Sequence, residues 1–195
     1  SILLASKLPI VETWNITDKP MDLVVGFSNY SAGYQITDYV VNLKYKKIAF
    51  ATPVESFMEN ENRSKRRLNG YLSRIKEANL KPVIFYYTQP MNHRICGEEI
   101  YTQFKKYKSK IDCIICGSEI SGTGLLSEFL FRQIKVPKNI GVAGIGNAEI
   151  TSLLQPQLTT IDFRVEEIGI VAANNLIDKI NKVKTKKRIF DTGIE

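Results

Sequence analysis

The sequence contains few of the residues on which enzyme chemistry most often depends. His93 is the only histidine among 195 residues, and it lies in a polar turn with no nucleophile or acid in a recognisable motif beside it. Catalysis of the Ser-His-Asp or Cys-His type, and any His-rich metal site, would depend on this one side chain. The sequence also lacks a GxGxxG run, a Walker-type phosphate loop and an HExxH motif. These absences predict no catalytic residues, no metal and no cofactor.

Cysteine is also scarce. The three cysteines are an odd number, which argues against a disulfide framework. Cys113 and Cys116 have CxxC spacing, but they lie in the apolar run 111–116, which predicts a buried strand. Residues three apart on a strand point to opposite faces of the sheet. We therefore do not expect these two thiols to share a metal or to pair.

Long apolar runs are absent. None approaches the ~18 residues that a transmembrane helix requires. Residues 1–7 (SILLASK) lack the basic segment and long apolar core of a secretory signal, so we expect a cytoplasmic protein with no membrane partner. The apolar share of 44% and the charged share of 24% are typical of globular proteins. The length suits one medium domain or two small lobes.

Basic residues exceed acidic ones by 27 to 20, which gives a net charge of +7 and favours anionic partners. They occur in four clusters, at 44–47, 63–67, 105–110 and 182–188. Solvated helix ends are the simpler interpretation, because basic residues favour helix C-termini. A nucleic-acid stripe would require the clusters to share one face, which the sequence does not show.

Short apolar runs alternate with amphipathic runs along the chain. The apolar runs predict strands, and apolar spacing of three and four residues predicts helices. The expected strands are 10–14, 23–27, 47–51, 82–87, 113–116, 141–145, 158–162 and 188–191. The expected helices are 31–43, 63–78, 97–107, 122–134 and 165–183. This alternation predicts an α/β protein with parallel sheets that bind ligands beyond the carboxyl ends of their strands.

Several strand–loop junctions resemble motifs of the LacI/GalR family of sugar-responsive repressors. Residues 136–145 (VPKNIGVAGI) resemble that family's VP(E/D)D(V/I)SV(V/I)G(F/Y) run, and residues 155–161 (QPQLTTI) resemble PPLTT(I/V). Residues 116–124 (CGSEISGTG) occupy the xNDxxAxG place. Residues 46–50 and 67–71 match two further runs of the family in the same order. Residues 9–14, 25–27 and Arg63 most resemble repressors of gluconate or related sugar-acid utilisation.

The resemblance implies a periplasmic-binding-protein-like fold of two parallel-sheet lobes joined by a hinge. Residues 1–28 plus 162–187 would be an incomplete N-terminal lobe, and residues 29–161 plus 188–195 the C-terminal lobe. The crossovers would fall near positions 27–28, 161–162 and 187–188. The helix-turn-helix headpiece that binds operator DNA in this family, and the first part of the N-terminal lobe, would be absent from this sequence. The resemblance also implies a homodimer.

The resemblance places Arg67 where the family has an arginine that reaches the cleft. Arg63 lies one helical turn earlier and can face the same side; exposed arginines at a helix start are the alternative for both. Asn147 and Ser118 could supply neutral hydrogen bonds to the ligand. Phe27 and Trp14 could stack on a sugar ring, although Trp14 could equally be a core residue.

Acidic residues that the family uses in its cleft are largely missing. Gly146 stands at the place of the family's aspartate. Ser118-Glu119 stands at the place of its Asn-Asp pair, so one acid is kept there in the longer form of Glu119. Phe27-Ser28 replaces an acidic residue near the first crossover. Because carboxylates repel an anion, their loss beside arginines favours a sugar acid such as gluconate as the effector. The alternative is that these positions drifted in a differently shaped pocket.

Three functions are compatible with this pattern. The first is the effector-binding and dimerisation part of a cytoplasmic transcriptional repressor, which responds by lobe closure. The second is a periplasmic sugar-binding protein, which the three cysteines disfavour. The third is a sugar-processing α/β enzyme, for which only scattered acids such as Glu98, Glu99 and Glu119 are available.

Overall fold

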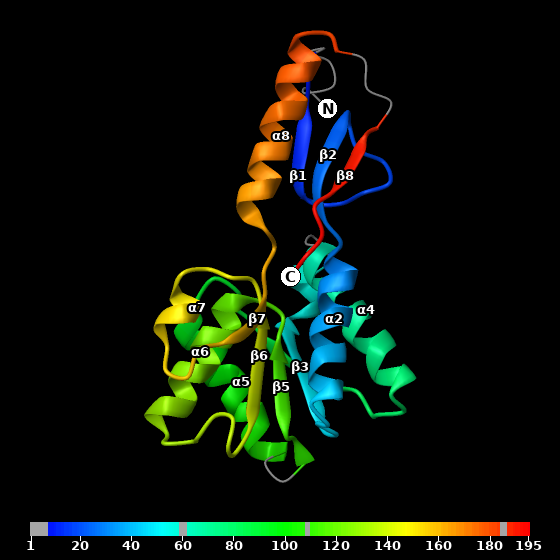
Figure 1. Ribbon diagram of the computed structural model, residues 1–195. Coiled ribbons are helices and arrows are strands. Elements are labelled where there is room, and N and C mark those ends of the chain that lie inside the picture. Colours follow the sequence, from blue (N-terminus) through cyan, green and yellow to red (C-terminus); the bar gives the residue numbers. More distant parts are fainter. Residues whose placement is uncertain (1–7, 59–61, 108–109, 184–186) are drawn as a thin grey trace. The chain divides into compact units, whose positions relative to one another are not determined.

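The computed structural model describes residues 8–58, 62–107, 110–183 and 187–195. These residues form two compact units, one made of residues 1–29 with 162–195 and the other of residues 30–161. We refer to them as unit 1 and unit 2. Each contains a sheet of parallel strands with helices packed against it, as the alternation of strands and helices predicts (Figure 1).

Unit 1 contains a three-stranded sheet in the order β1-β2-β8 and one long helix, α8. The elements are β1 (Val11–Asn15), β2 (Leu23–Phe27), α8 (Val165–Ile180) and β8 (Ile189–Asp191). The middle strand β2 is buried along its whole length, whereas Ile168 is the buried residue of α8. Ile170, Ile177 and Ile180 of α8 are between 53% and 62% exposed, so this helix buries only part of its apolar surface.

The final strand differs from the sequence-based expectation. Residues 188–195 were expected to complete the C-terminal lobe, with a crossover near 187–188. Instead β8 pairs with β2, with Val25 opposite Phe190, and belongs to unit 1. The physical reason is that the fully buried strand β2 would otherwise leave one of its two backbone edges unpaired. The other two crossovers were expected near positions 27–28 and 161–162. The chain passes between the units after residue 29 and after residue 161.

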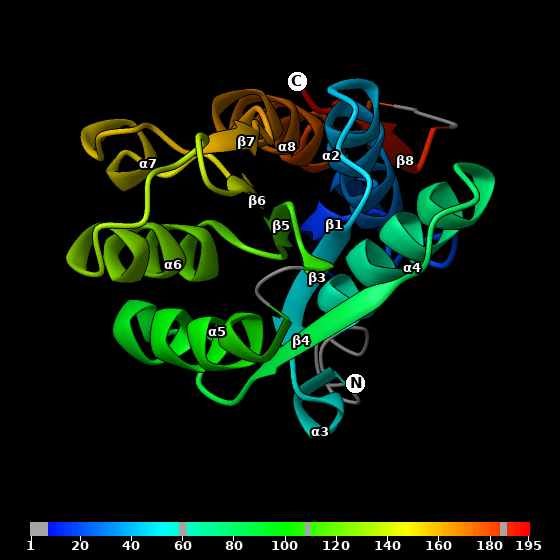
Figure 2. The same ribbon diagram turned by 90° about the horizontal axis from the view of Figure 1, so that it is seen from below.

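Unit 2 contains a five-stranded sheet in the order β4-β3-β5-β6-β7. Its strands are β3 (Ile48–Pro53), β4 (Val83–Tyr87), β5 (Cys113–Cys116), β6 (Gly141–Ile145) and β7 (Thr159–Ile161). Its helices are α2 (Asn29–Asn42), α3 (Glu55–Met58), α4 (Asn62–Glu77), α5 (His93–Tyr107), α6 (Glu119–Phe131) and α7 (Ile150–Leu153). Helices α5 and α6 cover one face of the sheet, and α2 and α4 cover the other (Figure 2). The short helices α3 and α7 were not predicted.

The core of unit 2 follows strand alternation. Cys116 belongs to the buried cluster beneath α5 and α6, together with Phe104 and Phe129, whereas Cys113 lies outside that cluster. The two thiols therefore face opposite sides, as the strand prediction required. All three cysteines are free and buried. Burial raises the pKa of Cys96 to about 11, so this thiol is not a reactive thiolate at neutral pH.

Two pairs of helices cross at glycines. A Cβ atom on Gly124 would overlap the carbonyl oxygen of His93, so α5 and α6 approach one another at this position. A Cβ atom on Gly33 of α2 would overlap the carbonyl oxygen of Arg67 of α4. Glycine is therefore required at these contacts because no side chain fits between the two backbones. The second crossing also fixes the position of Arg67.

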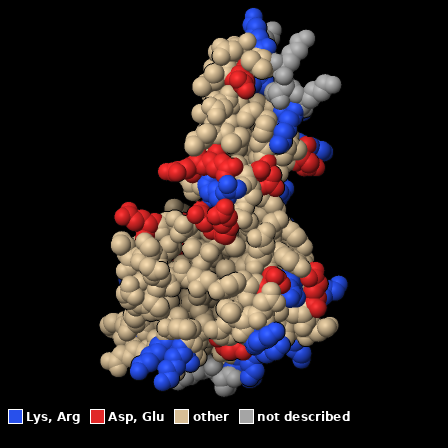
Figure 3. All heavy atoms as spheres, in the orientation of Figure 1, with Lys and Arg blue, Asp and Glu red and all other residues tan. Residues whose placement is uncertain are grey.

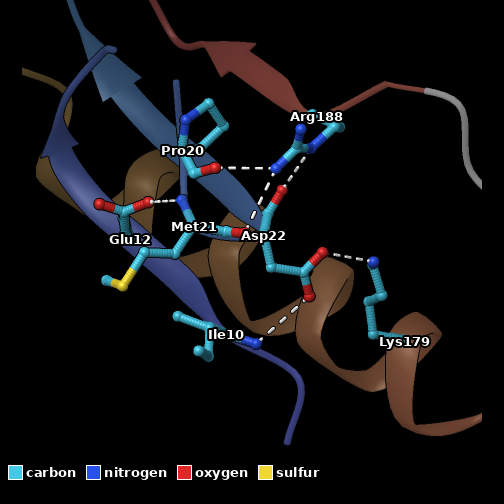
Figure 4. A network of polar contacts seen from close by, with 7 residues as sticks. All are labelled: Ile10, Glu12, Pro20, Met21, Asp22, Lys179 and Arg188. Atoms are coloured by element: carbon cyan, nitrogen blue, oxygen red, sulfur yellow. Dashed lines mark hydrogen bonds and ion pairs between the residues drawn. The ribbon is translucent and has the colours of Figure 1, made fainter. Parts of the chain in front are cut away.

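A network of polar contacts joins the three strands of unit 1 to α8 (Figure 4). The Asp22 carboxylate accepts a hydrogen bond from Lys179 Nζ at 2.6 Å and a longer one from the Ile10 amide. Arg188 donates to the carbonyl oxygens of Asp22 and Pro20 at 2.9 and 2.7 Å. The network therefore connects the turn before β2, the end of α8 and the start of β8.

Asp22 supplies a pH-dependent part of the stability of unit 1. Burial alone would raise the pKa of its carboxyl, but the hydrogen bond from Lys179, with help from the Ile10 amide, lowers the pKa below its ordinary value. Because the folded-state pKa is the lower one, this stabilisation is present above about pH 4 and is lost as the pH falls through the folded value. We expect Asp22→Asn to cost about 1 kcal/mol at pH 7 and to remove this pH dependence.

Fluorescence of Trp14, the only tryptophan, reports on unit 1 during urea unfolding. The matched control is Asp18→Asn, which removes an exposed carboxylate from the same β1–β2 connection. Equal unfolding of the Asp22 variant and the unmodified chain at pH 7 would contradict the assignment.

Candidate functional site

Arg67 lies at the carboxyl edge of the sheet in unit 2. Its Nη1 donates a hydrogen bond to the carbonyl oxygen of Gly117 at 2.8 Å, and Gly117 follows β5 directly. The side chain is half-buried, so it is not a freely solvated arginine at a helix start. Arg63 is exposed one turn earlier on α4. Helical spacing places the two guanidinium groups on the same side of this helix.

Ser118 is the N-cap of α6. Its side chain accepts a hydrogen bond from the Ser121 amide at 3.2 Å, and the Ser118 amide donates to Ser121 Oγ at 3.3 Å. Burial raises the pKa of the Tyr87 phenol above its ordinary value, although hydrogen bonds with Ser121 and Ser118 act in the opposite direction. The predicted ligand contact at Ser118 therefore sits in a cluster of buried hydroxyl groups, which holds this residue in place.

Glu119 is the one predicted site residue with an acidic side chain. It occupies the first turn of α6 and is half-buried. The positive end of the helix dipole favours a carboxylate at this place. Glu119 therefore has a structural reason to be acidic that does not depend on a ligand.

Gly146 and Asn147 follow β6, which is the neighbour of β5 in the sheet. Gly146 is buried and has φ of +116°, a backbone conformation that glycine adopts without strain. Its amide donates to Ile161 and its carbonyl accepts from Thr160. An aspartate at this place would be strained in the same conformation, which explains the glycine physically. Asn147 is exposed, and its Oδ1 lies 3.4 Å from Thr151 Oγ1.

The remaining predicted residues lie in unit 1, at or just beyond the carboxyl ends of β1 and β2. Trp14 is 39% exposed and has φ of +79°, which is unusual for a bulky residue. Phe27 is 1% exposed, and its ring stacks on Phe163 with centroids 4.2 Å apart. Its ring is therefore part of the core of unit 1, which corrects the expectation that Phe27 stacks on a ligand. Ser28 is half-buried between β2 and α2.

Sequence reasoning missed a pair of asparagines in unit 1. Asn29 is fully buried, and its Nδ2 donates to Asn15 Oδ1 at 3.1 Å. Asn15 is the last residue of β1. Asn29 lies two residues after the end of β2, directly after Ser28. The rule that located the other candidates, a polar residue just after a parallel strand, would have found both.

A hollow near a strand edge lies elsewhere in unit 2. A cavity of about 440 Å³ lies along β4 and α5. It is lined by Tyr86, Thr88, Glu98, Glu99, Thr102 and Gln103. Gln103 bonds the amide and carbonyl of Tyr86, and Glu99 accepts from Thr88. These side chains therefore cover the open backbone edge of β4, and no predicted site residue lines this cavity.

Two kinds of site are absent from the residues that the structure describes. Among them, no three His, Cys, Asp or Glu side chains gather as a metal site requires. In the same ranges, no helix has both the length and the apolar character of a membrane span.

The chain has a parallel α/β architecture with polar groups at the strand ends, and its sequence matches the periplasmic binding protein-like domain over residues 37–192. It belongs to that family. HTH-type transcriptional regulator GntR of Escherichia coli is 23% identical over 186 residues, covering 95% of this chain and 54% of that protein. NTD biosynthesis operon regulator NtdR of Bacillus subtilis is 26% identical over 81% of this chain and 47% of that protein. The chain thus spans about half the length of the curated relatives it matches.

Solved structures show the same fold. Transcription regulator GntR from Chromobacterium violaceum superposes with a TM-score of 0.89 at 23% identity, over 100% of this chain and 70% of that one. A periplasmic binding protein/LacI transcriptional regulator from Alkaliphilus metalliredigens, complexed with D-xylulofuranose, gives 0.81 at 20% identity, over 97% and 68%. The predicted fold class and the resemblance to LacI-type regulators are confirmed.

Proposed function

We propose that this chain is the effector-binding and dimerisation part of a cytoplasmic, DNA-binding transcriptional repressor whose effector is a sugar acid. The observation that carries the proposal is the Arg67 guanidinium, which is anchored on Gly117 at a strand end. The names of the HTH-type relatives support operator DNA as a further partner. The neighbour bound to D-xylulofuranose supports a ligand of the sugar class.

The charges of the candidate residues favour an anionic effector. A guanidinium binds a carboxylate through two parallel hydrogen bonds, and Arg63 adds a second positive charge on the same helix. A carboxylate in place of Gly146 would lie near the same strand ends. Two like charges ~4 Å apart, at an effective dielectric constant of ~20, repel by about 4 kcal/mol. A glycine at that position removes such a penalty for a carboxylate ligand.

The proposed mechanism is a population shift. In this mechanism the effector is bound more tightly by a closed state of the two lobes than by an open state. Contacts made only in the closed state shift the equilibrium toward that state. The same shift would change the affinity of the whole protein for its operator.

A homodimer is part of the proposal. Leu125, Leu126 and Phe129 of α6 are buried in the core, whereas Leu130 is 46% exposed. Leu153 of α7 is 69% exposed. Exposed apolar side chains of this kind support an interface between two copies, which sedimentation velocity of the chain would test.

The two alternatives have less support. A periplasmic transport protein is disfavoured because the relatives named above are transcriptional regulators. For an enzyme, two of the three acids named above are already engaged, since Glu98 pairs with Arg94 and Glu99 binds Thr88. We therefore propose that the chain is not an enzyme.

Substitution of Arg67 tests the proposed function. We expect Arg67→Ala to weaken gluconate binding by about 10- to 100-fold, because a hydrogen bond to a charged group contributes about 1.5–3 kcal/mol. Arg67→Lys should recover part of the loss, since lysine keeps the charge but not the two-pronged geometry. Isothermal titration calorimetry with gluconate and with glucose measures both effects.

The matched control is Arg94→Ala, which removes an exposed arginine from α5 of the same unit. It should leave gluconate binding unchanged. Tighter binding of glucose than of gluconate to the unmodified chain would overturn the sugar-acid assignment. Unchanged gluconate binding by Arg67→Ala would overturn the role of Arg67.

A further inference from the structure

The amino-terminal edge of the five-stranded sheet is basic. All its strands are parallel, so the four connections that lead into β3, β4, β5 and β6 meet at one edge. Hydrogen bonds hold some of these connections together. Asp112 accepts from the Lys46 and Lys47 amides at 2.9 Å each, and its carbonyl accepts from Gly141. Two of the basic clusters that are separate in the sequence are thereby brought side by side.

The connections share a set of exposed cationic side chains, which we call the basic edge. It consists of Lys44, Lys46, Lys47, Lys81, Lys105, Lys106, Lys110, Arg132, Lys135 and Lys138. Asp112 is the one carboxylate within the described parts of the connections 43–47, 78–82, 105–112 and 131–140. Both oxygens of its side chain accept hydrogen bonds from backbone amides. Figure 3 shows lysine and arginine gathered at the lower end of unit 2.

Helix-end chemistry accounts for only part of this charge. Lys105 and Lys106 lie in the last turn of α5, where the helix dipole favours them, and Arg132 pairs with Glu128 of α6. Lys46 and Lys47 instead lie beyond the end of α2, just before β3. The arrangement therefore differs from the solvated helix ends that were the simpler interpretation of the sequence. Two of the four basic clusters of the sequence, at 44–47 and 105–110, therefore share one edge of the sheet.

We propose that the basic edge binds the phosphate backbone of duplex DNA without reading its sequence. Lysine is a compact point charge that suits phosphate contact, and phosphate contacts carry no base information. Neighbouring strands are ~4.8 Å apart, so the connections into these four strands extend over about 14 Å, along which duplex DNA presents about eight phosphate charges. The choice of DNA among polyanions rests on the proposed function, in which the whole protein acts at an operator.

The salt dependence of binding tests this proposal. Fluorescence anisotropy with a labelled 30-base-pair duplex of arbitrary sequence would be measured between 50 and 200 mM KCl. If four phosphates are neutralised, the affinity should fall roughly 100-fold over this range, because log K falls by about 0.9 per neutralised phosphate for each unit of log salt. A second duplex of unrelated sequence should bind equally well.

A pair of charge-reversal variants locates the contact. The first is a double variant, Lys46→Glu with Lys106→Glu. The second double variant, Lys19→Glu with Lys182→Glu, changes the net charge by the same amount, and all four side chains are exposed. The first variant should lose at least 10-fold in affinity and show a shallower salt slope. The second, whose substitutions lie in unit 1, should change less than twofold. Circular dichroism melting would show that both variants fold.

Three results would overturn the proposal. The first is equal loss of affinity in the two variants, which would reflect net charge alone. The second is absence of binding to the duplex at 50 mM KCl. The third is binding to vesicles of 30% phosphatidylserine that is lost in the Lys46/Lys106 variant while duplex binding is kept, which would assign the basic edge to an anionic membrane surface.

Discussion

Gly33→Ala should destabilise unit 2 by about 2–3 kcal/mol and weaken effector binding at the same time. The new Cβ would overlap the carbonyl oxygen of Arg67, and backbone atoms on both sides leave no flexible group to move aside. The helices α2 and α4 must then separate. Because Arg67 lies at the crossing, its hydrogen bond to Gly117 should be strained or lost. Urea unfolding followed by circular dichroism, with calorimetry on gluconate, measures both effects.

Gly169→Ala is the matched control for this substitution. Gly169 lies in α8, and a Cβ built there meets nothing within 4 Å. Alanine favours the helix over glycine by about 1 kcal/mol, so this variant should be slightly more stable than the unmodified chain. Identical urea midpoints for Gly33→Ala and the unmodified chain would show that the helices can part at little cost. The close approach would then not be what positions Arg67.

Phe129→Ala should be the most destabilising core truncation of α6. The side chain is fully buried and packs edge-on against Phe104, with ring centroids 5.4 Å apart, and against Tyr101. Removing a buried phenylalanine ring costs about 3–5 kcal/mol, because the cavity closes only in part. We expect the Tm of unit 2 to fall by roughly 10 °C.

Phe131, two residues further along the same helix, is the natural comparison. It is 81% exposed, so Phe131→Ala should change the free energy of unfolding by less than about 0.5 kcal/mol. Differential scanning calorimetry of the two variants separates burial from residue type. Similar Tm values for both would mean that the hydrophobic cluster beneath α5 and α6 contributes far less than its burial implies.

Much of the fold could be predicted from local patterns. The run Cys113–Cys116 is a strand with its thiols on opposite faces, as apolar character and strand alternation require. The helix that carries Arg67 begins at Asn62, one residue from the predicted start. Short helices such as α7 were missed because four residues are too few to show a periodic pattern.

The candidate site was only partly predictable. The family resemblance located Arg67, which lies with Ser118 and Gly146 at one edge of the sheet in unit 2. The rule that ligands bind at strand ends located Ser118 and Gly146. It did not reveal that Phe27 is covered by Phe163, because a ring contact between residues distant in sequence depends on tertiary packing. The Asn15–Asn29 pair, by contrast, was open to the same rule, because both residues follow predicted strands.

The amino-acid sequence by itself determined the alternation of strands and helices, the parallel sheets and the family resemblance, because these depend on spacing within short segments. Only the tertiary structure decided that the last strand pairs with β2, that Arg67 reaches Gly117, and that separate lysine clusters meet at one sheet edge. Each of these depends on which segments become neighbours. That choice is made by the burial of whole strands and the crossing of helices at glycine, which no single segment encodes.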